Sequence, residues 1–274
     1  MKKIPYGRQN IDQSDIDVVV STLKSDFITQ GPKVAEFENS FSEYVNAKYA
    51  VAVNNATAGL HLSVLALGLS KGDRVITTSI SFAATANCIR YAGAEVWFAD
   101  INPETYLIDI NSVKELIKSK PEGFFKGIIP VDFGGLPVNL EELKKVALKY
   151  NLWIIEDASH SPGGYFIDSF GMKNHCGNCK YADIAVFSFH PVKHIACGEG
   201  GMITTNDQKF YKKLLRLRTH GITKDPKELN RNDGGWYYEM QDLGYNYRLS
   251  DISAALGISQ LERADKNLAI RRDI

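Results

Sequence analysis

Short runs of apolar residues alternate with amphipathic stretches along most of this chain. The runs are rich in β-branched and aromatic residues and are continuous, which is typical of strands buried on both faces. The predicted strands are residues 48–53, 73–79, 95–100, 126–133, 152–157, 183–189 and 201–206. The stretches between them predict helices over residues 56–69, 83–93, 110–119 and 139–151. This alternation predicts an α/β fold, a mostly parallel mixed sheet with helices on both faces.

The two ends of the chain follow another pattern. Residues 13–25 and 32–45 are amphipathic and predict two helices with no strand between them. Residues 251–274 read as one long, charge-rich and exposed helix, in which the sequence ends. A helix of this kind usually leads to a second domain or a partner, so we expect one there.

Charge and composition narrow the classes of function. The 274 residues contain 32 Lys plus Arg and 32 Asp plus Glu. This balance gives no basic surface for a nucleic acid or an anionic membrane, although one local site could still bind a small anion. No apolar run reaches the roughly 18 residues of a membrane span, and the first residues do not resemble a signal peptide.

Four cysteines in a chain of this length do not form a disulfide framework, which favours a reducing cytoplasm. Cys176 and Cys179 form a C-x-x-C motif that could be redox-active or half of a zinc site. A zinc site needs about four ligands, and no second motif supplies the others. We therefore predict no metal, and a polar surface turn with two reduced cysteines.

In a parallel sheet, ligands bind at the carboxyl ends of the strands, so the residues that follow each strand matter most. Asn54, Asn55 and Thr57 open the helix after the first strand, where free N–H groups and the helix dipole suit a phosphate. A plain N-cap would use the same residue types. Phe82 ends the next strand, where its ring could stack on a ligand or cover the sheet edge as a core aromatic.

Two acids, Glu156 and Asp157, end an otherwise apolar strand, where a carboxylate is costly unless it is paired. Asp157 could bind a ligand cation or cap the following turn. After the strand at 183–189, Lys193 lies five residues beyond Ser188 and just before a glycine-rich turn. An anion site, a ring, a carboxylate and a lysine at one sheet edge are the set that pyridoxal 5′-phosphate (PLP) requires.

Several segments of the chain resemble the DegT/StrS-type sugar aminotransferases, which are fold type I PLP-dependent transferases acting on nucleotide-linked keto-sugars. The resemblance spans nearly the whole chain. The segments that carry it include IPYGRQNID, FITQGPKVAEFE, VAVNNATAGLHL, GDRVITTSISFAATAN, IIEDASHSPGG, FSFHPVKHIACGEGGM and GYNYRLSDISAALGISQL. The most specific is S-F-H-P-x-K followed by G-E-G-G, and the opening motifs point to the branch of pseudaminic acid biosynthesis.

The resemblance assigns roles to individual residues. It implies that Lys193 forms the Schiff base, that Asp157 pairs with the pyridinium nitrogen and that His160 lies near the ring hydroxyl. The remaining cofactor contacts would be Thr57, Ala58 and Ser188 for the phosphate, Phe82 for stacking, and Asn246 for the phosphate of a neighbouring subunit. Thr29 would line the sugar site. His190 and His194 flank the lysine and could contact substrate, but local packing and turn hydrogen bonds are the favoured explanation for them.

The implied reaction takes an amino group from glutamate and transfers it to the 4-keto carbon of a UDP-linked 4-keto-6-deoxy-N-acetylhexosamine. The implied assembly is a homodimer with a shared active site.

Residues 1–250 would form the N-terminal helices and the PLP-binding large domain, and residues 251–274 would begin the connecting helix to a small C-terminal domain that this chain lacks. The C-x-x-C lies where the family carries a variable hairpin.

Two other functions fit the same fold. A sugar dehydratase of this family typically has histidine in place of the Schiff-base lysine, so Lys193 argues for amino transfer. A sensory or assembly domain that keeps the scaffold without turnover is the non-enzymatic alternative. Retained cofactor without amino transfer would distinguish it.

Overall fold

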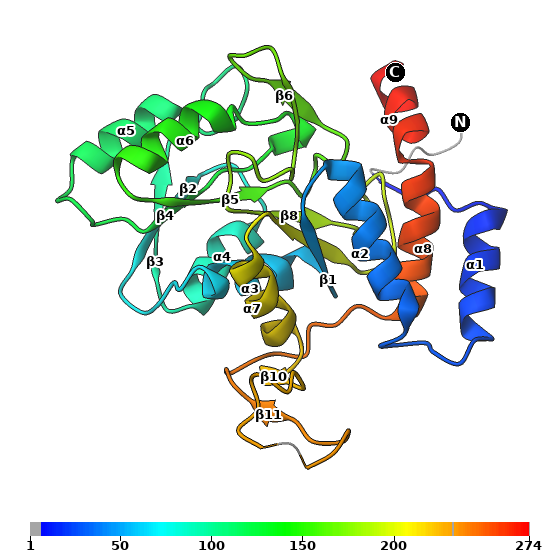
Figure 1. Ribbon diagram of the computed structural model, residues 1–274. Helices are drawn as coiled ribbons and strands as arrows, with labels where there is room; N and C mark the ends of the chain where they lie inside the picture. Colours follow the sequence, from blue (N-terminus) through cyan, green and yellow to red (C-terminus); the bar gives the residue numbers. More distant parts are fainter. Residues whose placement is uncertain (1–6, 232, 274) are drawn as a thin grey trace.

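A seven-stranded mixed sheet forms the centre of the protein in the computed structural model, which describes residues 7–231 and 233–273 (Figure 1). The strand order is β1-β9-β8-β5-β4-β2-β3, and only β9 runs antiparallel to its neighbours. The strands are β1 (Tyr49–Val53), β2 (Arg74–Thr78), β3 (Glu95–Ala99), β4 (Gly127–Ile129), β5 (Trp153–Asp157), β8 (Ile184–Ser188) and β9 (Gly201–Thr205). The predicted α/β class and the mostly parallel sheet are confirmed.

One predicted strand is too long. We expected residues 126–133, but β4 ends at Ile129. Residue 130 is a proline, which has no N–H to donate to a neighbouring strand. Only a single bridge, between Val131 and Asp157, continues the pairing beyond it.

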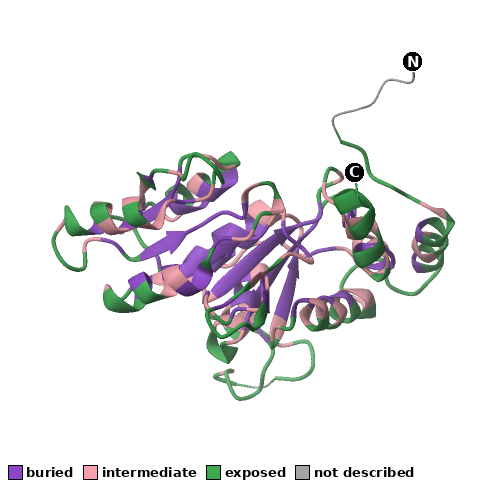
Figure 2. Ribbon diagram, turned by 90° about the horizontal axis from the view of Figure 1, so that it is seen from above, coloured by how far each residue is buried: buried purple, intermediate pink, exposed green. Residues whose placement is uncertain are grey.

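Helices cover both faces of the sheet, and strand alternation decides which side chains face which layer. Val51 and Val53 of β1 pack in one core cluster with α3 (Ala56–Ala66), α4 (Ala83–Tyr91) and α7 (Gln208–Arg218). Ala50 and Ala52 face the opposite core, under α2 (Pro32–Val45) and α8 (Asp251–Glu262). The helices α5 (Ile110–Lys118) and α6 (Leu140–Lys149) cover the other half of that face. Figure 2 shows the buried residues concentrated in the sheet and its adjoining helix faces.

The prediction of one long exposed helix over residues 251–274 is wrong. The helix breaks at Arg263, which has a non-helical φ of −105° and ψ of 3° and separates α8 from α9 (Ala264–Asp273). The helix α8 is mostly buried and contacts both α2 and α1 (Gln13–Leu23) (Figure 1). Gly257 allows the close approach, because a Cβ there would lie 2.6 Å from the Phe37 ring.

A buried polar network fastens α1 to α8. The Asp15 carboxylate accepts hydrogen bonds from Ser259 Oγ at 2.7 Å and from Gln260 Nε2 at 2.8 Å. Arg263 pairs with both Asp12 and Asp15. A buried carboxylate is tolerated only when it is paired in this way. At the break after α8, the Arg263 guanidinium supplies that pairing for the two aspartates of α1 and its N-cap.

Two small antiparallel pairs extend from the main body. The first joins β6 (Tyr165–Ile167) to β7 (Lys173–His175), and the second joins β10 (Ile222–Thr223) to β11 (Glu239–Met240). The C-x-x-C motif follows β7, as the hairpin prediction required. No helix in the described residues is long and apolar enough to cross a membrane.

The two cysteines of that motif do not lie on the surface, so the prediction of a polar surface turn is wrong. Cys176 and Cys179 are both buried and both reduced. The turn folds inward because Gly177, at a φ of +79°, packs against the Phe187 ring, and the Cys179 thiol donates to the carbonyl of Thr204.

Candidate active site

A cavity of about 1120 Å³ opens at the carboxyl ends of β1, β2, β5 and β8. This is the edge at which an open α/β sheet binds its ligands. Seven of the nine predicted site residues line it: Thr57, Ala58, Phe82, Asp157, His160, Ser188 and Lys193. Residues from four separate parts of the chain therefore meet in one cavity.

Lys193 lies in the loop that follows β8, half-buried at the cavity wall. Burial lowers the pKa of its amine, and the nearby charge of Asp157 opposes part of that effect. Among the residues that the structure describes, none pairs with the Lys193 amine. A free amine with a lowered pKa is suited to nucleophilic attack.

The Asp157 carboxylate is 4% exposed, and three donors hold it. Ser159 donates to Oδ1 through its hydroxyl at 2.6 Å and its backbone N–H at 3.2 Å. Thr85 Oγ1 donates to Oδ2 at 2.7 Å. Hydrogen bonds from two sides fix the orientation of the carboxylate. Asp157 does hold the following turn through Ser159, and the same side chain also lines the cavity, so both of its predicted roles are compatible.

His160 follows three residues later in the same loop and faces Phe133 across the cavity wall. The backbone N–H of Gly134 donates to its Nδ1 at 3.3 Å, so Nε2 carries the proton in the neutral ring. Burial lowers the pKa of His160, and the charge of Lys193 lowers it further. Gly135 is required beside it, because a Cβ there would lie 2.8 Å from the His160 carbonyl oxygen.

The N-terminus of α3 lies at the cavity wall, in the position predicted for a phosphate site. Asn55 is the N-cap, and its side chain accepts from the backbone N–H of Ala58 at 2.8 Å. The cap therefore already occupies the Ala58 N–H, and Ala56 and Thr57 supply the remaining first-turn donors. Gly201 brings β9 close to this turn, since a Cβ there would lie 2.7 Å from the Ala56 nitrogen.

Phe82 is 76% exposed and lines the cavity as the N-cap residue of α4. The alternative of a core aromatic that covers the sheet edge is therefore wrong. A large exposed ring at a cavity mouth is suited to stacking on a flat ligand.

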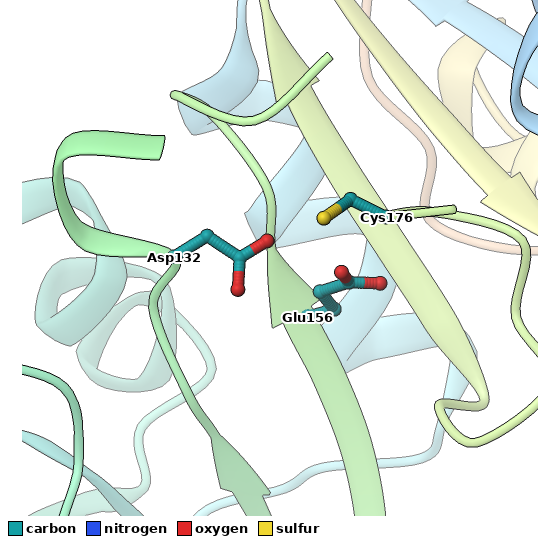
Figure 3. A group of neighbouring side chains, drawn as sticks. All are labelled: Asp132, Glu156 and Cys176. Atoms are coloured by element: carbon teal, nitrogen blue, oxygen red, sulfur yellow. The ribbon is translucent and has the colours of Figure 1, made fainter. Parts of the chain in front are cut away.

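Glu156 points away from this cavity, since neighbouring residues of a strand face opposite sides of the sheet. Its carboxylate, that of Asp132 and the Cys176 thiol form a buried cluster, with one possible ligand atom from each lying within 4.8 Å of the others (Figure 3). Burial raises the pKa of Glu156 well above its usual value, and the neighbouring Asp132 carboxylate raises it further. Two neighbouring buried acids would be accommodated together by sharing one proton, and the absence of a metal stays a prediction.

Two predicted residues lie outside the cavity. Thr29 is exposed and bridges Ser250 in the loop that precedes α8. Asn246 is exposed and bridges Thr219 beyond α7. Among the described residues, neither of the two lines the cavity, and their roles stay predictions.

Other residues of the site were not predicted. Thr85 and Ser159 hold Asp157, while Phe133, Tyr91 and Tyr247 line the cavity. Thr85 could have been found from its spacing. It lies three residues after Phe82, and residues three apart in a helix share a face, so Thr85 would lie on the same side of the helix as Phe82. Nothing in the sequence would have indicated the two tyrosines.

Comparison with known proteins gives a consistent result. Residues 9–274 match the DegT/DnrJ/EryC1/StrS aminotransferase family. A UDP-4-amino-4,6-dideoxy-N-acetyl-beta-L-altrosamine transaminase of Campylobacter jejuni (strain 81-176) is 44% identical over 99% of this chain and 67% of its own length. Helicobacter pylori PseC, an aminotransferase involved in the biosynthesis of pseudoaminic acid, superposes with a TM-score of 0.84 at 31% identity, covering 97% of this chain and 67% of that chain.

A sugar aminotransferase structure from Streptococcus pneumoniae, Spr1654 in its PMP form, superposes with a TM-score of 0.87 at 31% identity over 99% of this chain and 70% of that chain. The same protein is also known in a PLP form. The chain spans about two thirds of the length of the curated relatives that it matches. The chain belongs to the DegT/DnrJ/EryC1/StrS aminotransferase family.

Proposed function

We propose that this chain is the PLP-binding part of an aminotransferase that moves an amino group from glutamate to the 4-keto carbon of a UDP-linked 4-keto-6-deoxy-N-acetylhexosamine. One observation carries the proposal. An unpaired lysine amine with a lowered pKa and a buried, hydrogen-bonded carboxylate line the same cavity, Lys193 on one loop and Asp157 on another. The names of the Campylobacter and Helicobacter relatives support the sugar substrate.

The residues of the cavity fit PLP as a set. Thr57 and Ser188 hydroxyls, with the first-turn N–H groups of α3, would hold its phosphate, and Phe82 would lie against its ring. Asp157 would hold a proton on the ring nitrogen, and Lys193 would anchor the cofactor covalently. When bound, PLP supplies an electron sink for the substrate carbon that loses a proton.

Each protein group then has a defined task. Asp157, fixed by three donors, keeps the ring nitrogen cationic. Lys193 Nζ would attack the cofactor aldehyde as the neutral amine, which its burial favours, with loss of water. It would afterwards carry a proton from the substrate carbon to the cofactor carbon. His160, whose Nδ1 is occupied by Gly134, offers its Nε2–H as a donor. These roles follow from atoms that already line one cavity.

We further propose that two copies form a homodimer in the cytoplasm, with Asn246 of each copy reaching the phosphate site of the other. Asn246 is exposed and lies outside the cavity of its own chain. Phe82 is exposed at the cavity mouth, which a second copy could cover. Light scattering during size-exclusion chromatography would test the dimer, and a monomer that binds PLP with full affinity would contradict the shared site.

The absorption spectrum of the purified chain with PLP, before and after glutamate, tests the function. We expect a visible band from cofactor bound to Lys193, and its replacement by the ultraviolet band of the amine form after glutamate. A visible band that glutamate does not change would favour the non-catalytic alternative or another donor. No band at all would contradict PLP binding. Adding the UDP-linked keto-sugar to the amine form should restore the visible band.

The dehydratase alternative has no support in this cavity. Lys193 is present where that branch of the family typically has histidine, and the amine faces the same cavity as Asp157. We therefore retain amino transfer as the proposed reaction.

A further inference from the structure

Thr85 makes a contact with Asp157 that neither the sequence motifs nor the family assignment explains. It is fully buried in the first turn of α4 (Ala83–Tyr91), on a different element from Asp157. Its Oγ1 lies 2.7 Å from Asp157 Oδ2 and 2.5 Å from the Ser81 hydroxyl. Ser81 lines the cavity, so a chain of three oxygens runs from the cavity wall to the carboxylate.

The proton positions in this chain are determined by counting. A carboxylate can only accept, so the single Thr85 hydroxyl proton goes to Asp157. Thr85 Oγ1 must then accept, so the Ser81 hydroxyl proton goes to Thr85 at 2.5 Å rather than to the Phe82 carbonyl at 3.1 Å. Each hydrogen bond in such a chain polarises the next, which strengthens the bond to the carboxylate.

The same counting shows where a ligand can bind. The two oxygens of a carboxylate offer about four acceptor positions. On Oδ1, the Ser159 hydroxyl and N–H occupy both. On Oδ2, Thr85 occupies one. One position remains open, and it lies on the oxygen that Thr85 holds.

We propose that Thr85, oriented by Ser81, is a positioning residue that aims Asp157 Oδ2 at the ring nitrogen of the cofactor. Ser159 and Thr85 fix the carboxylate from two sides, so that only the remaining Oδ2 position is available to a cationic N–H donor. This inference rests on the proposed function, because it requires PLP in the cavity. It adds a residue to the site whose effect passes entirely through Asp157.

The experiment compares three variants of the whole chain. Thr85→Val keeps the shape and removes the hydroxyl, and Thr85→Ser keeps the hydroxyl. Thr77→Val is the matched control, because Thr77 is equally buried and donates to the Ile129 carbonyl at 2.8 Å in β2, outside the cavity. PLP affinity is measured by titrating cofactor-free protein, and thermal unfolding of the same samples reports folding.

We expect Thr85→Val to weaken PLP binding roughly tenfold, since it removes a hydrogen bond to a charged group. Thr85→Ser should stay within about twofold of wild type. Thr77→Val should lower the unfolding temperature while leaving PLP affinity unchanged. Equal affinity in Thr85→Val and wild type would overturn the inference, as would an equal loss in Thr77→Val.

Rescue by the conservative variant provides a readout that a merely structural role would not move. Only a hydroxyl that reaches Asp157 Oδ2 should restore PLP affinity, so Thr85→Ser should bind PLP like wild type and Thr85→Val should not, even where the two variants unfold at the same temperature. An equal loss of PLP affinity in both Thr85 variants would contradict the inference. Failure of wild type to bind PLP would instead contradict the proposed function itself.

Discussion

Asp157 and Glu156 are neighbours at the end of β5, and both are buried, but they lie in opposite environments. Asp157 faces the cavity and accepts three hydrogen bonds from Ser159 and Thr85. Glu156 faces the opposite layer, where its carboxylate lies beside Asp132 and the Cys176 thiol (Figure 3). The Asp157 carboxylate is surrounded by hydrogen-bond donors. The Glu156 carboxylate lies beside a second acid and a thiol.

This difference teaches that the partners of a buried acid, and not its burial, decide what it can do. Three donors fix the Asp157 carboxylate in one orientation, in which it could face a cationic ring nitrogen. Beside Asp132 the pKa of Glu156 is raised, which favours its protonated form, while its Oε2 accepts from the Gly177 N–H at 2.9 Å. The acid pair thereby holds the C-x-x-C turn in place and stands outside the chemistry.

The largest effect should come from removing the amine that faces Asp157. We expect Lys193→Ala to lose the borohydride-stabilised PLP adduct completely and to reduce amino transfer by at least about 10⁴-fold, since no other amine lines the cavity in the described residues. Peptide mass spectrometry locates the adduct. Lys173→Ala, on the exposed hairpin strand β7, is the control and should keep it. An adduct that persists in the cavity of Lys193→Ala would show that the wrong lysine was chosen.

The next test separates the two acids directly. Asp157→Asn cannot hold a proton on the ring nitrogen, so we expect turnover to fall roughly a thousandfold with the fold intact. Glu156→Gln replaces one neutral donor by another and should stay within about threefold of wild type. Steady-state kinetics and circular dichroism of both variants check this. Equal losses of activity in the two variants would abolish the distinction between them.

The pH dependence of stability should reveal the shared proton. The pKa of Glu156 is raised in the folded protein, so above about pH 4.3 the unfolded chain releases a proton that the folded chain retains. Wild type should therefore lose stability relative to Glu156→Gln as pH rises, by up to about 1.4 kcal/mol per pH unit, until the folded pKa is reached. Urea unfolding between pH 4 and 8 measures the difference. Parallel curves would indicate that Glu156 is ionised in the fold.

The smallest effect concerns the thiols. Burial raises the pKa of Cys176 well above its usual value, and Cys179 is buried as well. We expect both to react with a soluble disulfide reagent only after denaturation, and Cys176→Ala to change amino transfer by less than about twofold while costing roughly 1 kcal/mol of stability. Rapid labelling of the native protein would instead support redox chemistry at the C-x-x-C motif.

Much of the fold was predictable because its signals are local. Continuous apolar runs marked all seven strands of the main sheet, and amphipathic periods marked the helices between these strands, whereas α7 (Gln208–Arg218) was not predicted. The errors differ in kind. Pro130, a local signal, shortened β4. The final helix breaks at Arg263, whose guanidinium pairs with α1 at the other end of the chain, and no local pattern indicates that contact.

The sequence by itself determined the class of the fold, the family and the seven cavity residues that lie just after strands or within short motifs. These follow from residue order, since parallel strands bring their carboxyl ends to one edge. Only the tertiary structure decided which of two adjacent acids faces the cavity, that Thr85 holds Asp157, and that the cysteines turn inward beside an acid pair. Those outcomes depend on contacts between residues far apart in the sequence, such as Asp132 with Cys176 and Thr85 with Asp157, which no local pattern encodes.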